Sequence, residues 1–169
     1  MSDNLKAPHI LLASNNVEEM LKNIEPIIGP RATRKLRIEI RKNVLALFRL
    51  GLTHMVFANK INSREWRQKI SRLYYAAYNI RRAILLEFSG HFTTDSSDHK
   101  NVNQLPNDFP SKDVLGQQLR DMRQDRNLCD YSHGSKISDL IISPTDAEKF
   151  VAEFEKLARK YLTDRGVRI

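Results

Sequence analysis

The chain contains 169 residues, with 28 Lys and Arg against 20 Asp and Glu, so its formal net charge is +8. A hydrophobic content of 41% is too high for a disordered tail, and six Gly and six Pro are too few for a collagen-like repeat or a turn-dense β-sandwich. The single cysteine, Cys129, excludes an intramolecular disulfide and a zinc site built from several cysteines. Length and composition therefore favour one compact, basic domain with a modest extension.

Membrane and export signals are weak in this sequence. Its first four residues carry no basic side chain, and the apolar stretch at residues 10–13 is too short for the core of a signal peptide. No uninterrupted apolar run reaches the roughly 18 residues that a membrane helix needs. We therefore expect a cytoplasmic protein that does not enter a membrane.

Hydrophobic periodicity predicts a first, short helix over about residues 15–25, which the prolines and glycine of residues 26–30 then close. A second apolar series runs from residue 36 to residue 56 at helical spacing. Gly51 and Thr53 are candidates for a break or kink within it. The first sixty residues are therefore expected to be mainly helical.

The third and longest helix is expected to open at Ser63 as N-cap, to begin near Trp66 and to end at Gly90. Residues 91–110 show no sustained periodicity, so we expect a long loop there, with room for one helical turn. The central helix and this loop would thus account for the middle of the chain.

Two further helices follow this loop. One starts at Ser111 as N-cap and stops at Gly134, and the other starts with the cap-plus-proline pattern at Ser143 and stops at Gly166. No stretch alternates as a strand does over more than a few residues. The sequence therefore predicts an all-α protein.

Positive charge is concentrated in one part of the chain. Residues 31–82 contain fourteen of the 28 basic residues but only two acids, a local charge of +12, which leaves −4 for the remainder. Such asymmetry is typical of a nucleic-acid-binding face, although solvated helix faces or a charged partner protein would also account for it. The candidate nucleic-acid-binding residues on the third helix are Arg67, Lys69, Arg72, Arg81 and Arg82.

Most signatures of enzymatic sites are missing from the sequence. It contains no Gly-rich phosphate loop, no Gly-x-Ser-x-Gly motif and no His-Glu-x-x-His motif. The five histidines are scattered, without the close helical pairing that is usual in metal sites. We expect neither a metal nor an organic cofactor.

One dense polar cluster, residues 123–134, lies near the end of the fourth predicted helix. On an ideal helix Arg126 and His133 would share a face, about 20° apart around the axis and about 10 Å apart along it. Asp130 follows Arg126 by four residues and could fix the guanidinium in one rotamer. An arginine suits a phosphate and a histidine can move protons, so the pair could support phosphodiester chemistry. The alternative is an ordinary helix salt bridge followed by a capping histidine.

Several segments in sequence order resemble a known family. The third helix contains Ser-Arg-Leu-Tyr-Tyr-Ala-Ala-Tyr at residues 71–78, His99-Lys100 follows the loop, and Arg126-Asn127 precedes Asp130-Tyr131. With the closing amphipathic helix, these landmarks resemble the small prokaryotic proteins of the HEPN superfamily (higher eukaryotes and prokaryotes nucleotide-binding domains). The resemblance covers about residues 63–162.

This resemblance implies a dimerising up-and-down bundle of four to five helices over residues 61–169, with residues 1–60 as an added N-terminal helical extension. The family's Arg-x4–6-His motif acts as a metal-independent endoribonuclease at the dimer cleft. Here Arg126 and His133, with six intervening residues, and Asn127 would be catalytic, and Asp130 and Tyr131 would support them.

Three interpretations stay open. The protein could be an RNA-cleaving or RNA-binding toxin or defence component, paired with a nucleotidyltransferase-like antitoxin. It could instead be a non-catalytic helical module that binds nucleic acid or such a partner protein, or a purely structural helical dimer.

Overall fold

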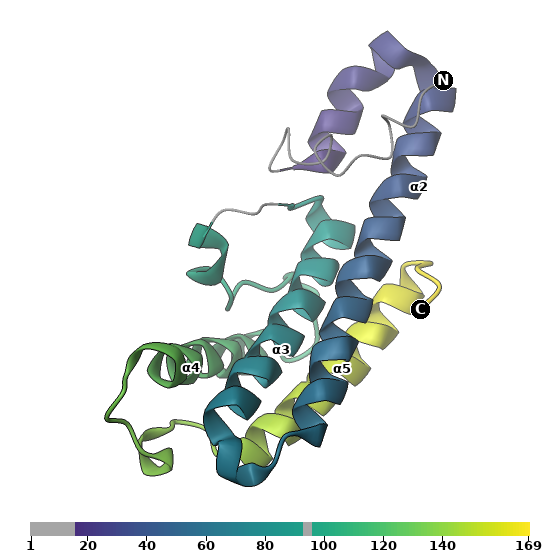
Figure 1. The fold of residues 1–169 in the computed structure, drawn as a ribbon. Helices are drawn as coiled ribbons and strands as arrows, with labels where there is room; N and C mark the ends of the chain where they lie inside the picture. Colours follow the sequence, from purple (N-terminus) through teal and green to yellow (C-terminus); the bar gives the residue numbers. More distant parts are fainter. Residues whose placement is uncertain (1–15, 93–95) are drawn as a thin grey trace.

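The computed structural model describes residues 16–92 and 96–169, and this part of the chain is an all-α helical bundle, as the sequence predicts (Figure 1). The expectations for residues 1–15 lie outside the described residues. The described residues form no strand. The helices are α2 (Val17–Lys60), α3 (Trp66–Ser89), α4 (Lys112–Tyr131) and α5 (Pro144–Asp164), with 3-10 turns η2 (Ser63–Glu65), η3 (Ser96–His99) and η4 (Ile137–Asp139).

Helix α2 consists of two helical segments joined by a turn at Gly29. This glycine has a φ of 78°, a conformation that other residues rarely adopt, and Pro30 follows it. The predicted end of the first helix at about residue 25 is therefore about three residues early, since the first segment continues up to Gly29. Figure 1 shows the purple N-terminal segment turning back against the long segment, and Arg37 donates to the Glu18 carboxylate across that turn.

The expected break at Gly51 is wrong, because the helix continues through it. A Cβ on Gly51 would lie 2.7 Å from Ile80 Cγ1 and 2.9 Å from the Ala76 carbonyl oxygen. The glycine is therefore needed for the close approach of α2 to α3, and not for a kink. Thr53 is accommodated in the helix through a hydrogen bond from its hydroxyl to the Arg49 carbonyl.

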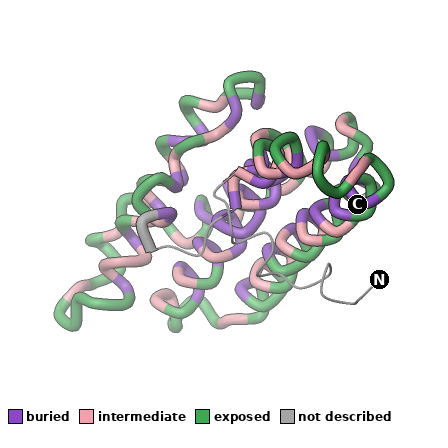
Figure 2. Tube along the Cα trace, turned by 90° about the horizontal axis from the view of Figure 1, so that it is seen from above, coloured by how far each residue is buried: buried purple, intermediate pink, exposed green. Residues whose placement is uncertain are grey.

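Helix α3 is the centre of the bundle and packs against α2, α4 and α5. One hydrophobic core joins all four helices, and Figure 2 shows the buried residues on their inward sides. Residues 30–60, expected to belong to an added extension, supply Leu36, Val44 and Phe48 to this core. They are thus a structural part of the bundle.

Local capping signals set most of the helix ends. Gly90 ends α3 in the left-handed conformation, and the Ser143 side chain caps α5 by accepting from the Asp146 amide, both as predicted. Ser111 precedes α4 but makes no side-chain cap, and Asn62 instead of Ser63 caps the turn before α3. No described helix is long and apolar enough to span a membrane.

Candidate functional site

Arg126 lies on α4, where it faces α3 and is held from several sides. Its Nη2 donates to the Tyr75 hydroxyl at 2.6 Å, and its Nη1 donates to Asn127 Oδ1 at 3.1 Å. Asp130 Oδ2 lies 2.7 Å from Nε as an i,i+4 ion pair, although the Nε–H is not directed at the carboxylate. The structure thus brings together three of the predicted site residues, Arg126, Asn127 and Asp130.

Three tyrosine rings surround this guanidinium. The Cζ atom of Arg126 lies 5.3 Å from the ring centre of Tyr75, 5.4 Å from that of Tyr131 and 6.0 Å from that of Tyr74. Such cation–π contacts stabilise the charge where water is partly excluded. Tyr131 itself is 70% exposed, so this predicted supporting residue covers the guanidinium from the solvent side.

The fixed guanidinium retains hydrogen-bonding capacity. Arginine has five N–H groups, two of them on each terminal nitrogen. The bonds to Tyr75 and Asn127 use one N–H on each of these nitrogens, so towards the described residues one N–H on each stays unused. Two such donors on one planar group match two oxygens of a phosphate.

A hollow of about 290 Å³ opens between α3 and α4, and its lining includes Tyr75 and Asp130, two residues that contact Arg126. Its lining combines two arginines and one carboxylate with uncharged side chains, and it contains the hydroxyl of Ser71, which donates to Asp130 Oδ1. The lining residues are Arg67, Gln68, Ser71, Arg72, Tyr75, Cys129 and Asp130. The volume is sufficient for a small anionic group.

His133 does not lie on the same helical face as Arg126. Helix α4 ends at Tyr131, Ser132 has extended backbone angles, and His133 follows as an exposed loop residue. The ideal-helix geometry expected for the pair is therefore wrong, because His133 lies two positions beyond the last residue of the helix. The predicted stop at Gly134 is also too late, since α4 has already ended.

Arg67 explains why the helix ends there. Its guanidinium donates to the backbone carbonyls of Cys129, Ser132 and Ser135 at 2.7–2.9 Å, and to the Ser135 hydroxyl at 2.9 Å. A cation at the C-terminal carbonyls also interacts favourably with the helix dipole. Arg67 therefore caps α4, and its predicted role as a nucleic-acid contact is corrected to a structural one.

The other predicted nucleic-acid-binding residues divide into two groups. Lys69 is buried and pairs with Glu148 at 2.5 Å, and Arg81 is 0% exposed, so neither presents its charge to a nucleic acid. Arg72 is exposed and lies over the ring of Phe57. Arg82 is partly exposed, 3.9 Å from the Asp98 carboxylate. Only Arg72 and Arg82 still fit the prediction.

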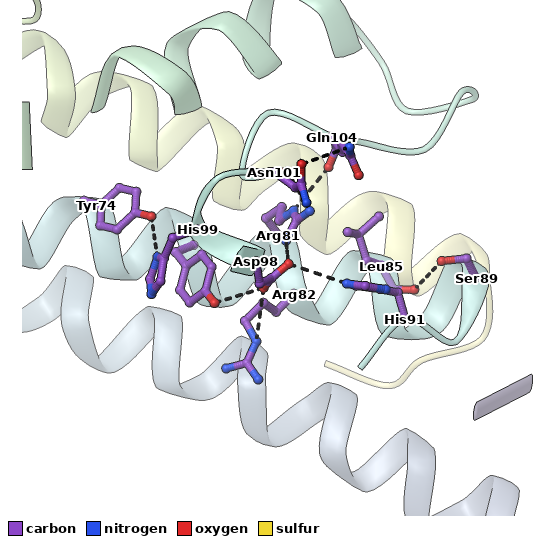
Figure 3. A network of polar contacts seen from close by, with 11 residues as sticks. Tyr74, Arg81, Arg82, Leu85, Ser89, His91, Asp98, His99, Asn101 and Gln104 are labelled. Carbon is purple, nitrogen blue, oxygen red and sulfur yellow. Dashed lines mark hydrogen bonds and ion pairs between the residues drawn. The ribbon is translucent and has the colours of Figure 1, made fainter. Parts of the chain in front are cut away.

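Arg81 belongs to a buried polar network that is not among the predictions made from the sequence (Figure 3). It donates to Asp98 Oδ1 at 2.6 Å and to the carbonyls of Asn101 and Gln104, while the Tyr78 hydroxyl donates to the other Asp98 oxygen at 2.9 Å. Burial raises the pKa of Asp98, but the charge of Arg81 and these hydrogen bonds outweigh it and lower the pKa. The network fixes η3 on α3.

This network places His99, the residue after Asp98, beside the Arg126 tyrosines. His99 Nδ1 lies 2.7 Å from the Tyr74 hydroxyl, and its ring stacks on Tyr78 with centres 4.2 Å apart. Burial lowers the pKa of His99, and the nearby charge of Arg126 lowers it further. A neutral imidazole and a cationic guanidinium therefore both contact the Tyr74 ring.

The sequence contained signals for this arrangement. Tyr74, Tyr78 and Arg81 recur at spacings of four and three residues, which puts an arginine on the apolar face of a helix and requires a buried acid nearby. The partner, Asp98, comes from a loop without periodicity, so only its proximity in the fold identifies it. His99 is one of the segments that resemble the HEPN family, but it is not among the predicted site residues.

Comparison with models of known protein families, with characterised proteins and with experimentally determined structures yields no significant match. In the part of the chain that the structure describes, no three His, Cys, Asp or Glu side chains are grouped closely enough to hold a metal ion. Any assignment of function therefore depends on the site itself.

Proposed function

We propose that this protein is an RNA-binding protein of the HEPN type, in which Arg126 holds a phosphate of the RNA backbone. One observation carries this proposal. Tyr75, Asn127 and Asp130 fix the guanidinium in one orientation, yet each terminal nitrogen keeps an N–H for a ligand. A planar donor that is oriented in advance loses little entropy when it binds a phosphate.

The surroundings of Arg126 support RNA over an acidic protein. Phe57 and Tyr131 are 52% and 70% exposed, and Arg72 lies 5.3 Å from the Phe57 ring centre. Exposed aromatic rings next to arginines suit the stacking of unpaired bases while the backbone follows the positive charge. Tyr131 thus contacts Arg126 itself, and Phe57 and Arg72 form a second such pair, in which Arg72 lines the same hollow as Tyr75 and Asp130.

RNA cleavage is the second candidate function, and the exposed position of His133 favours it. Arg67 fixes the backbone around His133, while the imidazole extends into solvent. In a homodimer two His133 side chains would flank the phosphate held by Arg126. One would take the proton of the ribose 2′-hydroxyl as its oxygen bonds to phosphorus, and the other would protonate the 5′-oxygen as its bond to phosphorus breaks. A toxin or defence role with a nucleotidyltransferase-like partner would follow from such an activity.

Binding is tested with a fluorescent single-stranded RNA of ten nucleotides and the full chain. Arg126→Lys keeps the charge but loses the planar pair of donors, so we expect roughly tenfold weaker binding. The control Arg120→Gln removes an exposed arginine from another side of the same helix and should bind as the unaltered protein does. Equal affinities for all three proteins would contradict the proposal, provided that thermal melts show all of them folded.

Cleavage is tested separately, by incubating the RNA with protein in EDTA. A ribonuclease of the proposed type would produce fragments that disappear with His133→Ala. Binding without fragments would leave the RNA-binding proposal intact and exclude the catalytic one under these conditions. Fragments from both proteins would exclude His133 as the proton-transfer group.

A further inference from the structure

His99 and Arg126 come from distant parts of the chain but contact the same two rings. The ring centre of His99 lies 5.8 Å from that of Tyr74 and 6.3 Å from that of Tyr75. The guanidinium carbon of Arg126 lies 6.0 Å and 5.3 Å from the same ring centres. The tyrosine pair on α3 is thus a common support for one imidazole and one guanidinium.

The hydrogen bond with Tyr74 determines which nitrogen of His99 carries the proton. Tyr74 is 0% exposed, and burial raises the pKa of its phenol, so the hydroxyl keeps its proton and needs an acceptor. Among the described residues that acceptor is His99 Nδ1, at 2.7 Å. A neutral imidazole that accepts at Nδ1 carries its hydrogen on Nε2. His99 is therefore a neutral donor, and not a proton acceptor, at Nε2.

Three contacts hold this donor in a fixed orientation. The His99 ring stacks on Tyr78, the Tyr74 hydroxyl binds its Nδ1, and the preceding Asp98 is buried in the ion pair with Arg81. No described residue hydrogen-bonds to Nε2, and Figure 3 shows His99 joined to Tyr74 through one ring nitrogen. His99 itself is only partly buried.

We propose that the Nε2–H of His99 and the free N–H groups of Arg126 form one phosphate subsite, with Tyr74 as the positioning residue that sets the histidine tautomer. This inference rests on the proposed function and assigns the subsite a particular chemistry. Arg126 supplies the charge, and His99 supplies a neutral, directed hydrogen bond. His99 is thus a binding group, and proton transfer belongs to another residue.

The tautomer is measured first, on the full chain labelled with ¹⁵N at histidine. Two-bond ¹H–¹⁵N spectra distinguish a protonated from an unprotonated ring nitrogen, and we expect Nδ1 of His99 to be unprotonated and Nε2 to be protonated. Tyr74→Phe removes only the hydroxyl and should convert this single tautomer into a mixture. An Nδ1–H tautomer in the unaltered protein would overturn the proposal.

Binding is then followed by titrating inorganic phosphate, and separately the ten-nucleotide RNA, into the labelled protein. We expect the Nε2 resonance of His99 to shift and to saturate with both probes. Arg126→Lys should raise the phosphate dissociation constant roughly tenfold, whereas Arg120→Gln should leave it unchanged. His99→Gln, which keeps an N–H donor, should bind more tightly than His99→Leu.

The outcomes separate this inference from the proposed function. RNA that binds without moving the His99 resonances would overturn the subsite and leave RNA binding in place. A His99 shift with phosphate but no binding of RNA would support the subsite and overturn the proposed function. Unmoved His99 resonances at saturating phosphate would also overturn the subsite.

Discussion

Replacing Asp98 by Asn should destabilise the bundle strongly, because it removes the charge opposite a buried arginine. The side chains of Arg81 and Asp98 are each 1% exposed, and their ion pair measures 2.6 Å. Removing one partner of such a pair typically costs about 3–5 kcal/mol. Arg81 also donates to the carbonyls of Asn101 and Gln104, so some compensation remains and we expect a loss of about 3 kcal/mol.

Urea unfolding followed by circular dichroism measures this loss, and a thermal melt should show a midpoint lowered by about 6–12 °C. Asp164→Asn is the control, because Asp164 pairs with Lys160 in an i,i+4 pair whose side chains are 61% and 75% exposed. Such a pair contributes about 0.5 kcal/mol or less. Equal unfolding free energies for the two variants would refute the view that the Arg81–Asp98 pair anchors η3.

Three further predictions concern packing, capping and pH. Gly51→Ala should lower stability by about 1–2 kcal/mol in urea unfolding, because the new methyl group meets Ile80 at 2.7 Å; a more stable variant would contradict this. Arg67→Met should speed amide hydrogen exchange in the loop after α4 while the middle of the helix stays protected, and unchanged exchange there would count against the cap. Burial lowers the pKa of His54 and of His99, so the unfolded chain binds more protons and stability should fall from about pH 7 to 5.5. The urea midpoint should depend less on pH in His99→Gln, and an unchanged dependence would exclude a contribution from His99.

Features encoded locally could be predicted from the sequence. The helix class, the cap at Ser143 and the stop at Gly90 depend on neighbouring residues, and the structure confirms them. The end of α4 could not be predicted in this way, because Arg67, about sixty residues earlier in the chain, binds its last carbonyls. Gly51 was similarly ambiguous, since a kink and a close helix contact favour the same residue.

The candidate site could be predicted only in part, for the same reason. Arg126, Asn127 and Asp130 lie within one helical turn or so of each other, and their contacts follow from that spacing. His99 reaches the site through a loop that a buried ion pair holds in place, and no periodicity in the sequence marks such a contact. Long-range polar contacts of this kind become visible only in the folded structure.

The salt dependence of RNA affinity tests the central claim most directly, because each phosphate contact releases counterions. A plot of the logarithm of the binding constant against that of salt concentration has a slope set by the number of phosphates neutralised. Arg126→Gln should reduce this slope by about 1 and weaken binding, whereas Arg120→Gln should change neither. Parallel plots for the Arg126→Gln variant and the unaltered protein would contradict a phosphate contact at Arg126.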